Sequence, residues 1–93
     1  MAQTLTDQEI DERLQGSDWQ REGDAITREL GFKDFAQAIA FVNRVAEAAE
    51  SANHHPDITI HSWNKVKLSL STHSAGGLTA ADFDMAARLD GLV

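Results

Sequence analysis

Four histidines are the side chains in this sequence best suited to proton transfer near neutral pH. They all lie between positions 54 and 73, and none falls within an apolar helix stripe. His54 and His55 precede Pro56, and His73 follows a stretch of alternating residues. Imidazole has an unperturbed pKa of about 6.5, and several imidazoles around one pocket would supply an acid and a base together. The pattern therefore indicates a general acid–base site.

Two carboxylates and a glycine-containing loop extend this candidate site. Glu50 and Asp82 are candidates to orient the histidines and to tune their pKa values. His73 is followed by Ser74-Ala75-Gly76-Gly77, where glycines would let a planar ligand approach the backbone closely. If the hairpin before this loop packs beside the end of the preceding helix, His73 approaches the two adjacent histidines.

Each of these residues also has a purely structural interpretation. His54 and His55 suit a turn that ends a helix, where cationic imidazoles favour the negative helix end. His73 also suits a polar strand end, and Glu50 a solvated helix surface. Asp82 fits the capping box of the last helix, and it can serve both purposes.

Metal and nucleophilic chemistry have less support in the sequence. Three histidines could bind zinc, but the sequence lacks an H-x-x-x-H helix pair or another clear ligand spacing. It contains no cysteine, and Ser71 or Ser74 near a histidine is weak evidence for an activated hydroxyl. We therefore expect no metal.

The length of the chain predicts a single domain over residues 1–93, because a chain this short supports one core. Small size also favours association, because a shared interface supplies burial that one short chain lacks. The net charge of −7 would repel a phosphate backbone, so direct nucleic-acid binding is not expected. No membrane-spanning stretch or secretory pattern is present, and the absence of cysteine suits the cytoplasm.

The candidate residues are predicted to sit on a helix–hairpin–helix–hairpin–helix chain. The first helix begins at Thr6, where Glu9 closes a capping box, and stops near Gly16. Residues 18–32 form a hairpin around Glu22-Gly23-Asp24.

The most regular helix runs from Asp34 to about Asn53 and ends before Pro56. Its predicted apolar stripe contains Phe35, Ile39, Val42, Ala46 and Ala49.

The second hairpin spans residues 58–73 and alternates apolar with polar residues. Gly76-Gly77 breaks the hairpin, and Thr79 with Asp82 repeats the capping box at the start of a last helix. Two hairpins make a four-stranded antiparallel sheet, so we predict an α+β fold with three helices on one face.

Three motifs in this chain occur together at a specific spacing. They are Glu50-Ser51-Ala52-Asn53-His54-His55-Pro56, then Trp63-Asn64-Lys65-Val66, then Ser71-Thr72-His73-Ser74-Ala75-Gly76-Gly77-Leu78-Thr79 followed by Asp82. A His-His-Pro alone would mean little, but this combination resembles the pterin-4a-carbinolamine dehydratases over nearly the whole chain. The resemblance implies the predicted four-stranded fold and assembly as dimers or tetramers.

The resemblance also implies a hydro-lyase reaction that supports tetrahydrobiopterin recycling. The substrate would be 4a-hydroxytetrahydrobiopterin, the pterin-4a-carbinolamine left by aromatic amino-acid hydroxylases, and the products quinonoid dihydropterin and water. This elimination requires protonation of the departing C4a hydroxyl and removal of a proton from N5. Neither redox chemistry nor a metal is needed for it, so the resemblance implies no cofactor, with the pterin as substrate.

By this similarity His54, His55 and His73 form the catalytic set. His54 and His55 would share the acid and base roles, and the assignment would depend on which hydroxyl epimer is bound. His73 would hydrogen-bond the leaving hydroxyl or help to protonate it.

A supporting set follows from the same resemblance. Glu50 and Asp82 match acidic positions near the family's site, and the backbone at Ser71 and Thr72 would contact the edge of the pterin ring. Asn53 stands where animal members carry an aspartate. Asparagine can orient a histidine through a hydrogen bond, but it carries no charge.

A non-enzymatic interaction, coactivator or assembly module on the same fold is the alternative function. Animal relatives also act as dimerisation partners of a homeodomain transcription factor, and divergent relatives assist assembly of the carbon-fixing carboxylase. The intact His-His-Pro and Thr-His elements of this chain favour the enzyme.

Overall fold

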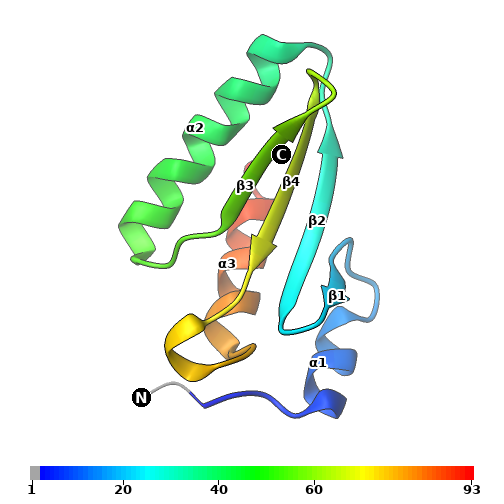
Figure 1. Cartoon of the computed structure of the whole chain (residues 1–93), viewed down its shortest axis with the longest axis vertical. Helices are drawn as coiled ribbons and strands as arrows, with labels where there is room; N and C mark the ends of the chain where they lie inside the picture. Colours follow the sequence, from blue (N-terminus) through cyan, green and yellow to red (C-terminus); the bar gives the residue numbers. More distant parts are fainter. Residues whose placement is uncertain (1–2) are drawn as a thin grey trace.

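The predicted order of helices and hairpins is confirmed in the computed structural model, which describes residues 3–93 (Figure 1). The elements are α1 (Asp7–Leu14), β1 (Gln20–Glu22), β2 (Ala25–Gly31), α2 (Phe35–Ala52), β3 (Asp57–His61), β4 (Lys65–Leu70), the 3₁₀ turn η1 (His73–Ala75) and α3 (Ala80–Asp90).

The capping box at the start of α1 is confirmed. The Thr6 amide donates to Glu9 Oε1 at 2.9 Å, and the Glu9 amide donates to Thr6 Oγ1 at 3.1 Å. Donation from the Thr6 backbone lowers the pKa of Glu9, because the bond favours the charged carboxylate. Two amides that the helix leaves without a backbone acceptor are thereby satisfied.

The two hairpins join through their inner strands into one antiparallel sheet of order β1-β2-β4-β3. Strand β2 pairs with β4 in a register that sets Ile26 opposite Leu70 and Leu30 opposite Val66. Strand β3 pairs with β4 and forms one edge of the sheet. The end of the second hairpin is therefore held against the start of β2.

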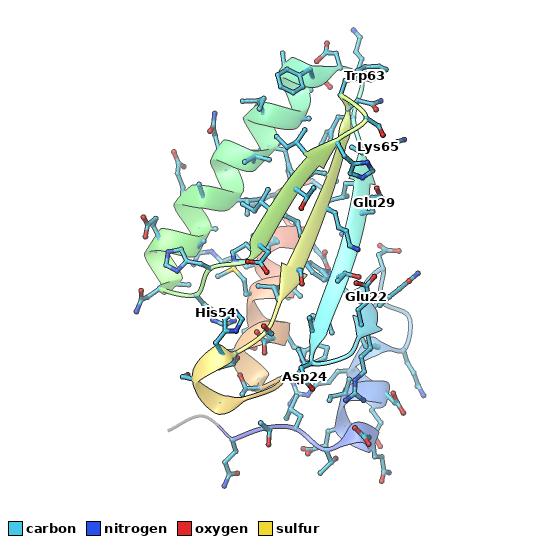
Figure 2. All side chains as sticks on the ribbon, in the orientation of Figure 1. Glu22, Asp24, Glu29, His54, Trp63 and Lys65 are labelled. Atoms are coloured by element: carbon cyan, nitrogen blue, oxygen red, sulfur yellow. The ribbon has the colours of Figure 1, made fainter. Side chains whose placement is uncertain are left out.

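One face of the sheet carries the core, and the other face is polar. The apolar strand residues Ile26, Leu30, Val66, Leu68 and Leu70 share a single core cluster with buried residues of all three helices. Figure 1 shows α3 behind the sheet. The polar face of the sheet is turned towards the viewer in both figures, and Glu22 and Glu29 on this face are labelled in Figure 2. The predicted α+β fold is confirmed.

The predicted apolar stripe of α2 is wrong in most of its members. The residues that α2 buries are Ala38, Phe41, Val45, Ala48 and Ala49. Of the predicted set only Ala49 is buried, whereas Phe35 is 53% exposed. Apolar residues stand at adjacent positions along this helix, so two stripes lie about 100° apart on it. Spacing alone does not decide which stripe faces the sheet.

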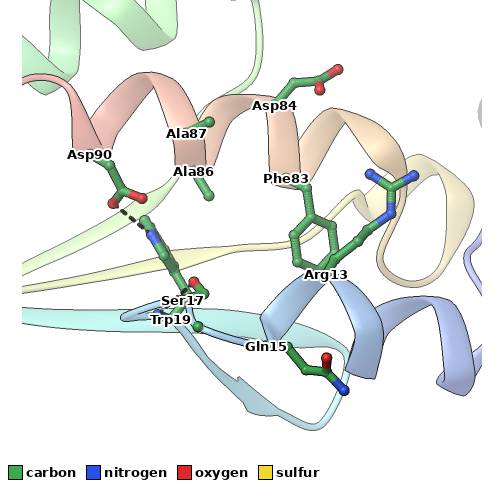
Figure 3. A pocket seen from close by; sticks show the side chains of 10 residues that line it. Arg13, Gln15, Ser17, Trp19, Phe83, Asp84, Ala86, Ala87 and Asp90 are labelled. Carbon is green, nitrogen blue, oxygen red and sulfur yellow. Dashed lines mark hydrogen bonds between the residues drawn. The ribbon is translucent and has the colours of Figure 1, made fainter.

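The end of α3 is tied to the first hairpin by Asp90. Its Oδ1 accepts from the indole Nε1 of Trp19 at 2.8 Å and from Arg28 at 2.5 Å. Beside this contact a surface hollow of about 390 Å³ lies between α1 and α3, with Arg13 stacked over Phe83 (Figure 3). Within residues 3–93, no helix is long and apolar enough to cross a membrane.

Candidate active site

The turn that carries His54 and His55 is formed by the C-terminus of α2. Asn53 caps the helix in the left-handed conformation, with φ 51° and ψ 42°. Asparagine is one of the few residues that adopt this conformation at low cost. The His54 amide donates to the carbonyl of Ala49 at 3.1 Å. In the described part of the chain, the Asn53 side chain makes no hydrogen bond to a histidine, so its contribution here is to the backbone.

His73 lies in a 3₁₀ turn, which corrects the prediction that it closes a strand. Strand β4 ends at Leu70, and the Thr72 carbonyl accepts from the amides of Ala75 and Gly76 at 3.0 and 3.1 Å. Gly76 has φ 75°, a conformation that suits glycine. Because the Thr72 carbonyl is used within the turn, the strand ladder does not continue and His73 is turned away from the strand direction.

A buried carboxylate joins the two histidine-bearing segments. Asp82 is fully buried at the start of α3. Its Oδ1 lies 2.6 Å from His54 Nε2, and its Oδ2 accepts from Thr72 Oγ1 at 2.8 Å and from the Thr79 amide at 2.9 Å. Thr72 Oγ1 also lies 2.8 Å from Thr79 Oγ1. Figure 2 shows His54 beside the segment that follows β4. Both oxygens of the carboxylate are therefore paired.

His55 has a different environment from His54. Its Nε2 lies 3.0 Å from Glu50 Oε2, but the side chains of the pair are 54% and 78% exposed. The His54 side chain is 18% exposed and its carboxylate partner is fully buried. Exposed pairs contribute little and are screened by solvent. His54 is thus fixed in place, whereas His55 is held by a weak surface contact.

A hollow of about 310 Å³ lies beside Thr72, between the β1–β2 turn and the segment after β4. It is lined by Asp24, Ala25, Ser71, Thr72, His73, Gly76 and Gly77. Thr72 is common to this hollow and to the buried carboxylate contacts. His54 borders a separate hollow of about 270 Å³ between the end of α2 and α3.

The structure thus gathers five of the eight predicted site residues into two linked groups, and His55, Glu50 and Asn53 belong to neither. One group contains His54, Asp82 and Thr72, and the other contains His73 and Ser71 around the hollow. Glu50 contacts only His55 among the predicted residues.

Two further residues at the site were missed by sequence reasoning. Thr79 was recognised only as a helix cap, although the Thr79-x-x-Asp82 box was its signal. Asp24 gave no signal, because it reaches the hollow through the pairing of β2 with β4.

His61, which matches none of the motif histidines, pairs with Glu29 on the polar face of the sheet. Within residues 3–93, no three histidine, aspartate or glutamate side chains are grouped so that they could hold a metal ion. The fold and the site define a small α+β protein in which a half-buried histidine contacts a buried carboxylate.

The sequence pattern of a known family, described as Pterin 4 alpha carbinolamine dehydratase, matches residues 3–92. A relative from Nostoc sp., provisionally named pterin-4-alpha-carbinolamine dehydratase, is 56% identical over 90 residues and 96% of each chain is covered. A relative of the same name from Roseiflexus castenholzii is 53% identical over 94 residues, with both chains fully covered. The chain belongs to the pterin-4a-carbinolamine dehydratase family.

Two solved structures are similar to this fold. A Brucella melitensis protein described as a transcriptional coactivator/pterin dehydratase superposes with a TM-score of 0.87 at 37% identity, covering 96% of this chain and 97% of that one. A pterin dehydratase-like protein described as a RuBisCO assembly factor of the alpha-carboxysome superposes with a TM-score of 0.64 at 27% identity, covering 80% and 84% of the two chains.

The buried carboxylate should dominate the stability of this region. Asp82→Ala leaves the Thr79 amide and the Thr72 hydroxyl buried without their acceptor, so we expect the free energy of unfolding to fall by about 3 kcal/mol. Asp84→Ala, on the exposed side of the same helix, should change it by less than about 0.5 kcal/mol. Urea denaturation followed by circular dichroism measures both, and equal losses would contradict the assignment.

Proposed function

We propose that this protein dehydrates a 4a-hydroxytetrahydropterin to the quinonoid dihydropterin. The observation that carries the proposal is the contact of His54 with buried Asp82, which Thr72 connects to the hollow beside His73. Membership of the dehydratase family supplies the substrate class. Recycling of tetrahydrobiopterin in the cytoplasm is the role that we propose for the reaction.

The elimination breaks one bond to oxygen and one to hydrogen. The base removes the N5 proton, the electron pair of the N5–H bond forms the C4a=N5 double bond, and the C4a–O bond breaks. The acid protonates the departing hydroxyl, which leaves as water. A positioned acid and a positioned base each contribute typically about 10²–10⁴-fold to such a step. We propose that the protein performs it without a cofactor.

The three histidines are proposed to divide the proton transfers. Asp82 holds His54 in one orientation, as a carboxylate does for a histidine that acts as a base. His73 lines the hollow together with Ser71, so we place His73 at the leaving hydroxyl. His55, which is exposed beside Glu50, would exchange its proton from the solvent side.

An interaction module on the same fold is the second candidate function. Relatives of known structure are described as a coactivator/pterin dehydratase and as an assembly factor, so the fold is compatible with such roles. A site used only for docking would not need a histidine fixed by a buried carboxylate. We therefore favour the enzyme.

Stopped-flow ultraviolet spectroscopy of carbinolamine decay tests the proposed activity, with the 4a-hydroxypterin generated by a phenylalanine hydroxylase. The protein should accelerate the decay, and His73→Ala should lower kcat by about 100-fold, because it removes a proton donor at the leaving group. His61→Ala is the matched control and should retain wild-type kcat, since His61 pairs with Glu29 away from the site. No acceleration by the folded wild type would favour the interaction module.

We also propose that the chain forms a homodimer or homotetramer through the outer stripe of α2. Phe35 is 53% exposed, and Ile39 and Val42 are only half-buried on the same side of the helix. A two-fold axis lets such a stripe pack against its copy in a second chain, which would bury apolar area that one short chain leaves open.

Light scattering after size-exclusion chromatography should give a wild-type mass of two or four times the 10.2 kDa of one chain. Val42→Glu places a charge within the stripe and should shift the protein towards the monomer, because an unpaired charge is costly to bury. Gln37→Glu, at an exposed position of the same helix, should leave the mass unchanged. A monomeric wild type, or a variant of wild-type mass, would contradict the interface.

A further inference from the structure

The geometry points to Thr72 and Thr79 as positioning residues that keep a hydrogen on His54 Nε2 and leave Nδ1 as the atom through which His54 exchanges its proton. This inference rests on the proposed function for the identity of the substrate alone. The arrangement of the hydrogen bonds is argued from the site itself.

The direction of each hydrogen bond around Asp82 follows from the number of hydrogens available. The Thr79 amide can only donate, so Asp82 Oδ2 accepts from it at 2.9 Å. The Thr72 hydroxyl donates its single hydrogen to the same oxygen at 2.8 Å. Thr72 Oγ1 has then no hydrogen left for Thr79, so Thr79 Oγ1 donates to Thr72 Oγ1 across 2.8 Å. The two hydroxyls form a relay that ends on the carboxylate.

This relay determines where the hydrogen between Asp82 and His54 lies. The two donors on Oδ2 offset the cost of burying a carboxylate, so we assign Asp82 as an ionised acceptor. The contact of 2.6 Å to Oδ1 must then be donated by His54 Nε2. A neutral His54 therefore carries its hydrogen on Nε2, and a cationic His54 carries hydrogens on both nitrogens.

The other ring nitrogen is free to act. Among residues 3–93, no side chain hydrogen-bonds His54 Nδ1, and the His54 side chain is 18% exposed. His54 therefore serves as a base through the Nδ1 lone pair, or as an acid through Nδ1–H. Neither threonine hydroxyl needs to touch the substrate for this, because both act through Asp82. Both threonine hydroxyls thus serve to orient the imidazole of His54.

Nitrogen-15 NMR of the histidine rings tests the inference without an activity measurement. Two-bond proton–nitrogen correlations at alkaline pH should show His54 with Nε2 protonated and Nδ1 unprotonated in the wild type. Thr72→Val removes the hydroxyl that donates to Asp82 Oδ2 at nearly constant volume and should give a mixture of the two tautomers. Thr72→Ser keeps the hydroxyl and should restore the wild-type spectrum.

The ratio of the effect on kcat to the effect on KM distinguishes a positioning role from a purely structural one. Thr72→Val should lower kcat about tenfold at little changed KM, which corresponds to the loss of one hydrogen bond to Asp82, and Thr72→Ser should remain within about twofold of wild type. Thr59→Val is the matched control, because Thr59 is exposed on β3 and lies outside the relay.

A wild-type His54 with its hydrogen on Nδ1 would overturn the inference, whether or not Thr72→Val folds. An unchanged tautomer and an unchanged kcat in Thr72→Val would overturn it as well. An inactive wild type with Nε2 protonated would instead overturn the proposed dehydration and leave the assignment of the hydrogen standing. The two failures are therefore distinguishable.

Discussion

The buried carboxylate of Asp82 is the contact on which the arrangement of the site depends. It joins three segments that are far apart in the sequence, namely the turn after α2, the segment after β4 and the first turn of α3. A buried charge is tolerated only where donors surround it, and this one has three. The same contacts that allow Asp82 to be buried hold His54 beside Thr72. Stability and positioning of the site thus have one physical origin.

The rest of the fold provides the conditions for that contact. Pairing of β2 with β4 sets the end of β4 against the β1–β2 turn, which forms one wall of the hollow beside His73. The left-handed Asn53 ends α2 where the chain must turn towards Asp82. The result is one rigid histidine in a buried network, one exposed histidine paired with Glu50, and one histidine in a glycine-containing turn. Such unequal environments suit a reaction that needs an acid and a base at the same time.

Features that depend on neighbouring residues were predictable from the sequence, and features that depend on contacts between distant segments were not. Capping boxes, the alternation of β4 and the histidine turn depend on residues within four positions of each other, so their patterns are visible in the sequence. Three other features depend on packing between segments that are distant in the sequence. They are the strand that pairs with β4, the stripe of α2 that faces the sheet, and the position of Asp24 at the hollow. His73 was misplaced for a related reason, because the turn bonds to the Thr72 carbonyl compete with strand pairing. Thr79 was identified as a cap, but its hydroxyl partner seven residues away was not.

A titration of the nitrogen-15-labelled protein with 7,8-dihydrobiopterin, a stable pterin that resembles the product, tests most directly whether these linked residues form one pterin site. Chemical-shift changes are expected for the backbone amides of residues 53–55 and 71–77 and for the side chains of His54, His55 and His73. The polar sheet face around His61 should not respond. Saturable changes confined to the first set would support a single site organised by Asp82. Changes centred elsewhere, such as on the hollow between α1 and α3, or no changes at all, would contradict it.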